Sequence, residues 1–293
     1  MRGLIAFVTL LLATGFFVTL FETANAQTKG AATDSNDKTS EKSKSKKSAT
    51  AEPLGPRDFR SPNFLLHTDL PKEEAEDLLK RLESMLGLIS KYWGKPNRQP
   101  IECFVVRDLS LWPPGSLDQE GRAKIEERAG VTLTLARTVR GTNEVVAAKA
   151  TVYAVADRGT PQHEAVHAYC GQNFGRTGPV WYSEGMAEMG QYWRVGESRV
   201  HCHPQAVKFL RRSKPKTLNT IVNAREITGD SWENYCWRWA LCHLLANNPN
   251  YYDRFRPLGL GILMDKPDAT FDHVYGSMAK EISFEYPELI RCR

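Results

Sequence analysis

The chain has 293 residues and a formal net charge of +5, a length that fits one sizeable domain or two small ones. Residues 27–62 carry eight basic and five acidic side chains, which leaves a net charge of only +2 on residues 63–293. Because the basic balance belongs largely to one short segment, the composition excludes the basic face typical of a nucleic-acid-binding domain. We therefore expect no nucleic-acid partner.

The first 26 residues have the pattern of an export signal. Arg2 precedes an almost wholly apolar run at residues 4–21, and residues 24–26 (Ala-Asn-Ala) form a small-x-small cleavage site. We predict a cleaved signal peptide over 1–26 and a periplasmic or extracellular location. An uncleaved membrane anchor is the alternative, because a run of about 18 apolar residues approaches the length that spans a bilayer.

Residues 27–62 are rich in Lys, Ser, Thr and Ala and contain almost no large apolar side chain before Leu54. Such a segment buries too little apolar surface to offset the entropy of ordering, so we predict a disordered linker. It would act as a solvated spacer. Weak association with an anionic envelope surface is the alternative.

Residues 63–157 combine helical and strand patterns. In residues 69–93, acidic side chains come first, and apolar residues then recur at helical spacing until Gly94 and Pro96 end the helix. Two runs rich in β-branched residues, 131–139 and 145–155, predict a β-hairpin. Further predictions are strands at 64–67 and 101–106 and a short polar helix at 117–129.

The run His163-Glu164-Ala-Val-His167 predicts a zinc site. Thr160 as N-cap and Pro161 in the first turn predict a helix over about 161–173. Residues four apart share one helix face, so both imidazoles can reach one ion, while Glu164 can reach a water bound to it. The alternative is a pair of ordinary buried histidines.

A second helix, predicted over about 179–193, carries two further carboxylates. Catalytic zinc usually has three protein ligands and a water, and Glu184 is the natural third ligand. Glu188 lies one turn further along the same face, where it can accept a hydrogen bond from a ligating histidine. A solvated charge is the alternative for Glu188.

The remaining sequence is helical in pattern, with helices expected at about 205–212, 230–246, 251–264 and 270–282. Asp230 and Glu233 form a capping-box pattern at the start of the second of these. Strands and a helix followed by helices predict an α+β fold, with an α/β part at 63–157 and a helical catalytic part at 158–293.

Six cysteines in an exported chain permit disulfides, and fifteen pairings are possible. Cys236 and Cys242 fall on different faces of one predicted helix, so we do not expect them to pair. Cys170 is expected to be a packing or disulfide residue. His201 and His203 alternate along an extended segment and are expected at the surface.

The run His163-Glu164-x-x-His167 followed by Trp181-x-x-Glu184-Gly-x-Ala-Glu188 resembles the gluzincin metallopeptidases. It looks most like the secreted bacterial peptidase-MA-like proteins. The resemblance covers about residues 158–194. The upstream Gly-x-Met-Glu-Asn run of the aminopeptidase branch is absent, so the resemblance does not imply aminopeptidase specificity.

This resemblance implies a zincin-like fold in which a mixed sheet backs the metal helix and a helical lobe closes the cleft. It implies one Zn²⁺ held by His163, His167 and Glu184, with Glu164 as general base. A tyrosine early in a later helix would stabilise the oxyanion, and Tyr235 is the best match. Packing in the helical lobe is the alternative for Tyr235.

In such folds the strand that borders the cleft holds the peptide substrate by β-addition. Residues 145–155 are the candidate here, with a core strand as the alternative. We therefore expect an exported zinc metallopeptidase acting on peptides or proteins. A non-catalytic zinc-containing binding module of the envelope is the competing interpretation, although such a module would not need Glu164.

Overall fold

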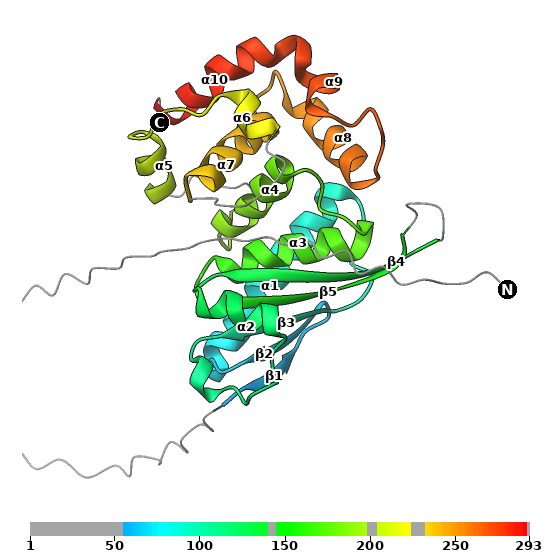
Figure 1. The fold of residues 1–293 in the computed structure, drawn as a ribbon, viewed down its shortest axis with the longest axis vertical. Helices are drawn as coiled ribbons and strands as arrows, with labels where there is room; N and C mark the ends of the chain where they lie inside the picture. The colour runs from blue at the N-terminus through cyan, green and yellow to red at the C-terminus, as the bar shows by residue number, and fades with distance from the viewer. Residues whose placement is uncertain (1–54, 140–144, 198–203, 224–231, 292–293) are drawn as a thin grey trace, which may run out of the picture.

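A computed structural model describes residues 55–139, 145–197, 204–223 and 232–291. In this part of the chain, the N-terminal half forms a mixed five-stranded sheet with the strand order β1-β2-β3-β5-β4 (Figure 1). The outer pairs β1–β2 and β4–β5 are antiparallel, and β2, β3 and β5 run parallel. The strands are β1 Arg57–Arg60, β2 Phe64–Thr68, β3 Ile101–Val106, β4 Gly130–Thr138 and β5 Val145–Val155.

Strand β1 lies inside the segment that composition predicted to be a disordered linker. Arg57–Arg60 pairs with β2 in register, with Phe59 opposite Leu66, and the Arg57 guanidinium donates to the carbonyl of Leu70 at 2.7 Å. The prediction of a linker up to residue 62 is therefore wrong at its end. Backbone pairing orders this strand, in which only Phe59 is apolar and packs against the core.

The predicted pairing of β4 and β5 is confirmed, but β5 is not the strand at the edge of the sheet. β5 lies between β3 and β4, whereas β4 is at the edge of the sheet. The prediction that residues 145–155 border a substrate cleft is therefore wrong, and the alternative of a core strand holds. The long connection through β4 lets β5 return into the sheet beside β3.

Helices cover both faces of the sheet. Helix α1 (Lys72–Trp93) and helix α3 (Thr160–Phe174) share one apolar core with side chains from one face, including Leu66, Val105 and Val152. Helix α2 (Gln119–Glu126) packs on the other face, where Val131 and Tyr153 form a smaller cluster. Alternate strand residues point to opposite faces, which is why Val152 and Tyr153 belong to different clusters.

The C-terminal half is helical, and α3 lies between it and the sheet (Figure 1). α4 packs on α3, and α7 packs on α4, so the expected α+β arrangement is confirmed. The helices are α4 Val180–Tyr192, α5 Pro204–Leu210, α6 Leu218–Val222, α7 Trp232–Asn247, α8 Tyr252–Leu263, α9 Phe271–Tyr275 and α10 Ala279–Arg291, with short 3₁₀ turns at Leu109–Leu111 and Gly276–Met278.

Two details of the helical half differ from the sequence prediction. The expected helix over 270–282 is divided into α9, a 3₁₀ turn and α10, and α6 was not predicted. Asp230, the expected cap of α7, lies outside the described residues. Within the described residues, none of the helices is long and apolar enough to cross a membrane.

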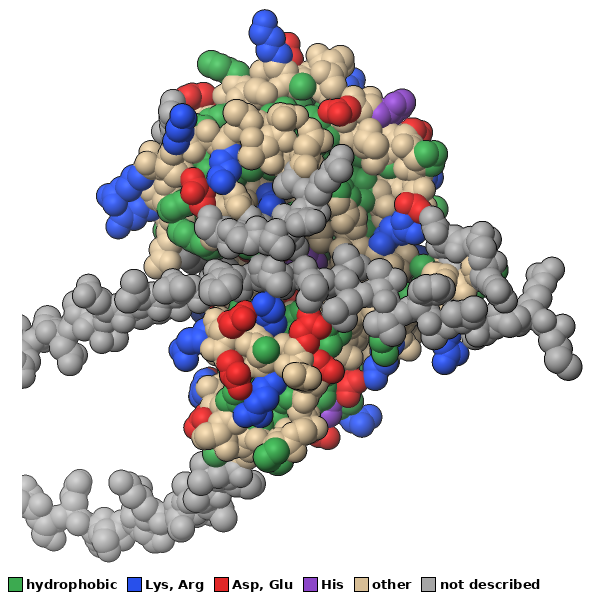
Figure 2. All heavy atoms as spheres, viewed as in Figure 1, with side chains coloured by type: hydrophobic (Ala, Val, Ile, Leu, Met, Phe, Trp, Pro, Cys, Tyr) green, Lys and Arg blue, Asp and Glu red, His purple; other side chains and the backbone are tan. Residues whose placement is uncertain are grey.

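Acidic and basic side chains are interspersed over the sheet half on the face seen in Figure 2. This mixture matches the small net charge of residues 63–293.

Candidate metal centre

The N-terminus of α3 is fixed by Asp157. Its carboxylate accepts hydrogen bonds from the backbone N–H groups of Gly159 (2.8 Å) and Thr160 (2.6 Å) and from the Thr160 hydroxyl (2.8 Å). Gly159 is the N-cap and Thr160 the first helical residue, so the prediction of Thr160 as cap is wrong by one position. Pro161 stands in the first turn as expected, where its missing N–H costs no helical hydrogen bond.

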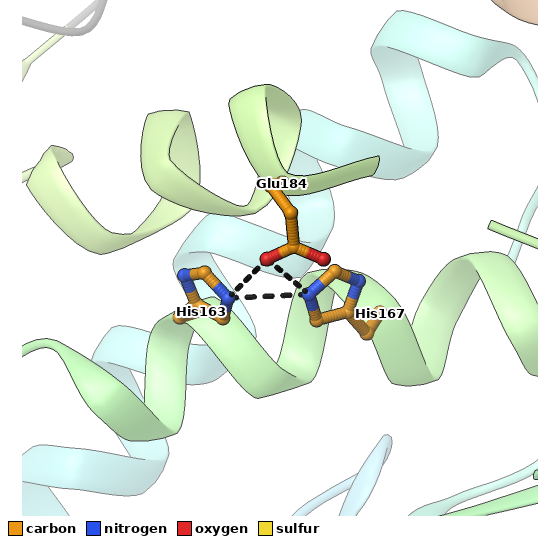
Figure 3. Close-up of side chains that lie close together, drawn as sticks. All are labelled: His163, His167 and Glu184. Atoms are coloured by element: carbon orange, nitrogen blue, oxygen red, sulfur yellow. Dashed lines mark hydrogen bonds and ion pairs between the residues drawn. The ribbon is translucent and has the colours of Figure 1, made fainter. Parts of the chain in front are cut away.

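His163 and His167 lie one turn apart on α3, and Glu184 faces them from α4 (Figure 3). The two Nε2 atoms are 3.2 Å apart. Oε2 of Glu184 is 3.3 Å from Nε2 of His163 and 3.5 Å from Nε2 of His167. All three side chains are buried, and their ligand atoms are close enough together to hold one metal ion. The structure thus brings the three predicted ligands to one point.

The charges of these groups are strongly coupled. Burial lowers the pKa of His163, but the carboxylates of Glu184 and Glu188 outweigh it and hold that pKa well above its usual value. Burial raises the pKa of Glu184, but the two imidazoles outweigh it and hold that pKa well below its usual range. Glu184 is therefore an ionised carboxylate at neutral pH.

Each of the two histidines has a neighbouring polar group at its Nδ1 atom. Oε1 of Glu188 lies 3.2 Å from Nδ1 of His163, and the Ser183 hydroxyl lies 3.3 Å from Nδ1 of His167. Contacts at Nδ1 orient the two rings, and both Nε2 atoms face Oε2 of Glu184. Glu188 is fully buried, so the alternative of a solvated charge is wrong. The role of Ser183 was not predicted.

Glu164 is buried between α3 and the edge strand. The Thr132 hydroxyl lies 2.8 Å from Oε2 of Glu164 and 2.9 Å from its backbone oxygen, and having one hydrogen it donates to one of them at a time. A Cβ atom on Gly130 would come within 2.8 Å of the Glu164 side chain, so only glycine leaves room there. Burial raises the pKa of Glu164, and the nearby imidazoles only partly oppose this.

Glu164 is not part of the group that can hold the ion, because that group consists of His163, His167 and Glu184. This separation matches the roles predicted from the sequence, in which one carboxylate binds the metal and the other does not. The two side chains also come from different helices, α3 and α4.

Tyr235 lies on α7 next to the predicted metal ligands. Its ring centroid is 6.1 Å from that of His163, in an edge-on orientation, and the side chain is only 2% exposed. The guanidinium of Arg238 lies over the same ring at 5.6 Å. The predicted catalytic tyrosine is therefore beside the site, in a position that also suits packing.

Gly185, directly after Glu184, lets α7 approach α4. A Cβ atom there would lie 2.4 Å from Sγ of Cys242 and 2.8 Å from the backbone oxygen of Arg238. The close approach of α7 is what places Tyr235 near the histidines. The Glu-Gly pair of the motif thus combines a predicted ligand, Glu184, with a close contact between helices.

The four described cysteines are free and buried, namely Cys103, Cys170, Cys236 and Cys242. The interpretation of Cys170 as a packing residue therefore holds, and Cys236 and Cys242 do not pair, as expected. Cys202, Cys292, His201 and His203 lie outside the described residues.

No protein-family model and no curated protein matches this chain. The relation to the gluzincins therefore remains a resemblance that stands on the motif residues of α3 and α4.

Proposed function

We propose that this protein is an exported zinc-dependent metallopeptidase of zincin-like fold. The observation that carries the proposal is the arrangement of His163, His167 and Glu184 around one point, with a further buried carboxylate, Glu164, that is not among the ligands. A structural metal site needs ligands only. A hydrolytic site also needs a base beside the ion.

The donor set and its spacing fit zinc. Two imidazole nitrogens and one carboxylate oxygen are a common set for catalytic zinc, whereas calcium and magnesium favour oxygen ligands. Tetrahedral zinc with bonds of about 2.0–2.1 Å would hold its ligand atoms about 3.3–3.4 Å apart. The observed separations of 3.2, 3.3 and 3.5 Å agree with this value.

Bound zinc would supply a water of lowered pKa and would polarise the scissile carbonyl. Glu164 would accept the proton of that water at a carboxylate oxygen and pass it to the leaving nitrogen. Its raised pKa suits a group that must both take and return a proton near neutral pH. The Thr132 hydroxyl holds the carboxylate in place for this transfer.

Two further groups complete the proposed site. The Tyr235 hydroxyl would donate to the oxygen on which negative charge develops. The outer edge of β4, which has no neighbouring strand among the described residues, would pair with the backbone of an extended peptide. β4 carries Thr132 and contacts α3, so a peptide along this edge would lie near the site.

Export rests on residues 1–26, which lie outside the described residues. N-terminal sequencing of secreted protein should begin at Gln27 if this segment is cleaved. Intact Met1 in a membrane fraction would favour the anchor.

Zinc content and peptide cleavage, measured on the same samples, test the function. Wild-type protein should contain one zinc per chain and cleave members of a peptide library, whereas His167→Ala and Glu184→Gln should lose zinc and activity together. Zinc equal to wild type in both variants would contradict the ligand assignment. Full zinc in wild type with no cleavage of any peptide would favour the non-catalytic binding module.

A further inference from the structure

A hollow separate from the metal centre lies between α1, α4 and α7, with a volume of about 540 Å³. This size is within the roughly 300–1,000 Å³ typical of small-molecule sites. Met85 and Ile89 of α1 and Met186 and Met189 of α4 are among its lining residues, and Leu88, 43% exposed, is another. Unbranched methionine side chains adapt readily to flexible apolar ligands.

The lining offers apolar surface and few free hydrogen-bonding groups. The indole N–H of Trp93 donates to the Tyr182 hydroxyl at 3.2 Å, and that of Trp193 donates to the backbone oxygen of Glu197 at 3.1 Å. A peptide would bring backbone N–H and C=O groups that find few partners here, and leaving them unpaired is costly. An alkyl chain has no such groups.

The charged residues that line the hollow are both cationic, Lys91 at the end of α1 and Arg256 of α8, and the described lining contains no acidic residue. Nε of Arg256 donates to the backbone oxygen of Tyr92, which fixes the guanidinium at the end of α1. Neither cation makes an ion pair with an acidic side chain among the described residues. The hollow therefore combines an apolar lining with positive charge.

We propose that this hollow binds a free fatty acid, with the alkyl chain between α1 and α4 and the carboxylate beside Lys91 and Arg256. The apolar lining favours the chain, and the two cations favour an acid over a neutral lipid. Fatty-acid binding would not require the metal ion, so this proposal can be tested independently of the proposed peptidase activity.

Displacement of a fluorescent fatty acid from the full-length protein tests this inference, with laurate and its uncharged counterpart dodecanol as probes. Laurate should bind saturably at one per chain and about five- to tenfold more tightly than dodecanol, as expected for two exposed ion pairs. Lys91→Gln/Arg256→Gln should remove that preference and leave dodecanol binding unchanged. The matched control Lys80→Gln/Arg254→Gln changes exposed cations of α1 and α8 outside the hollow and should bind both probes like wild type.

A second variant tests the location. Ala246 of α7 lines the hollow and is partly buried, so Ala246→Trp should fill it and weaken both probes at least tenfold, with thermal unfolding measured to show that the protein remains folded. Equal affinity for laurate and dodecanol, absence of saturable binding, or unchanged binding in folded Ala246→Trp would each overturn the proposal. Displacement by an apolar hexapeptide at lower concentration than laurate would also overturn it, because the site would then be a peptide site.

Discussion

Helices α1 and α3 lie against the same face of the sheet, yet their sequences are organised in opposite ways. The seven buried residues of α1 are all apolar and recur at helical spacing. In α3, fourteen of fifteen residues are buried, and these include Gln162, His163, Glu164, His167, Gln172 and Asn173. The buried face of α1 is held mainly by apolar packing, with hydrogen bonds such as those from Asn63 to Glu83 added at its surface, whereas α3 buries polar groups that must each find a partner.

The hydrogen-bond partners of the buried polar side chains in α3 distinguish those that hold the fold together from those that belong to the candidate metal site. Gln162 donates to the backbone oxygens of Gly190 and Trp193, and Asn173 donates to Asn97, so these side chains connect elements of the fold. The two histidines instead face titratable side chains of α4 and each other. Buried polar groups that meet other titratable groups, rather than backbone, are the ones that indicate chemistry.

Substitutions in α1 and α3 test this difference between the two helices. The largest effect, a loss of peptide hydrolysis, is expected for Glu164→Gln in α3. The amide keeps the size of the side chain and can still accept from Thr132, but it cannot take a proton. Peptide hydrolysis should fall by roughly 10²–10⁴-fold, while zinc content and thermal stability stay at the wild-type level. Hydrolysis at the wild-type rate would show that Glu164 is not the base.

Tyr235→Phe is expected to follow, with kcat reduced by roughly 10²–10³-fold, as when an oxyanion donor is lost. Zinc content and KM should change little, because the ring remains beside His163. Steady-state kinetics on a peptide that the wild type cleaves provides the measurement. Unchanged kcat would assign Tyr235 to packing alone.

A substitution in the buried face of α1 is expected to lower the stability of the protein and to leave the activity of the folded molecules unchanged. Leu82 is fully buried, so Leu82→Ala should lower the free energy of unfolding by about 2–5 kcal/mol, measured by urea denaturation. Lys80→Gln on the exposed face of the same helix is the control and should change it by less than about 0.5 kcal/mol. Activity per folded molecule should equal wild type in both. A specific activity loss in folded Leu82→Ala would contradict the division of roles between α1 and α3.

The smallest effect is expected at Thr132. Thr132→Val removes one hydrogen bond, worth about 0.5–1.5 kcal/mol, so kcat should fall roughly two- to tenfold. Thr132→Ser keeps the hydroxyl and should restore most of the rate, and zinc content should be unchanged in both. Equal rates for the valine and serine variants would remove Thr132 from the positioning of Glu164.

The sequence predicted the groups that lie on one helix or on a named motif, and missed those that tertiary structure supplies. His163 and His167 follow from helical spacing, and Glu184 and Glu188 follow from the next helix. Thr132 could not be assigned, because a threonine in a strand is an ordinary β-former until the register places it against Glu164. Ser183 is adjacent to Glu184, but nothing in its spacing indicates a contact with His167.

The order of the strands in the sheet and the first strand, β1, could not be predicted from the sequence either. A hairpin pattern does not say which of its strands faces the rest of the sheet, so residues 145–155 were wrongly expected to border the cleft. β1 was hidden because a composition average over residues 27–62 is dominated by the Lys- and Ser-rich part. α1 and β3 were predicted well because their apolar patterns decide their structure locally.

The buried free thiols can report local unfolding in three parts of the molecule. Cys103 lies in β3, Cys170 in α3 and Cys242 in α7, and burial raises the pKa of each well above its usual value. Because thiolates are the reactive form, these residues can be alkylated only when their surroundings open. The labelling rate at each therefore measures the free energy of opening for the sheet, the metal helix and the helical half separately, and would show whether they open as one unit or in turn.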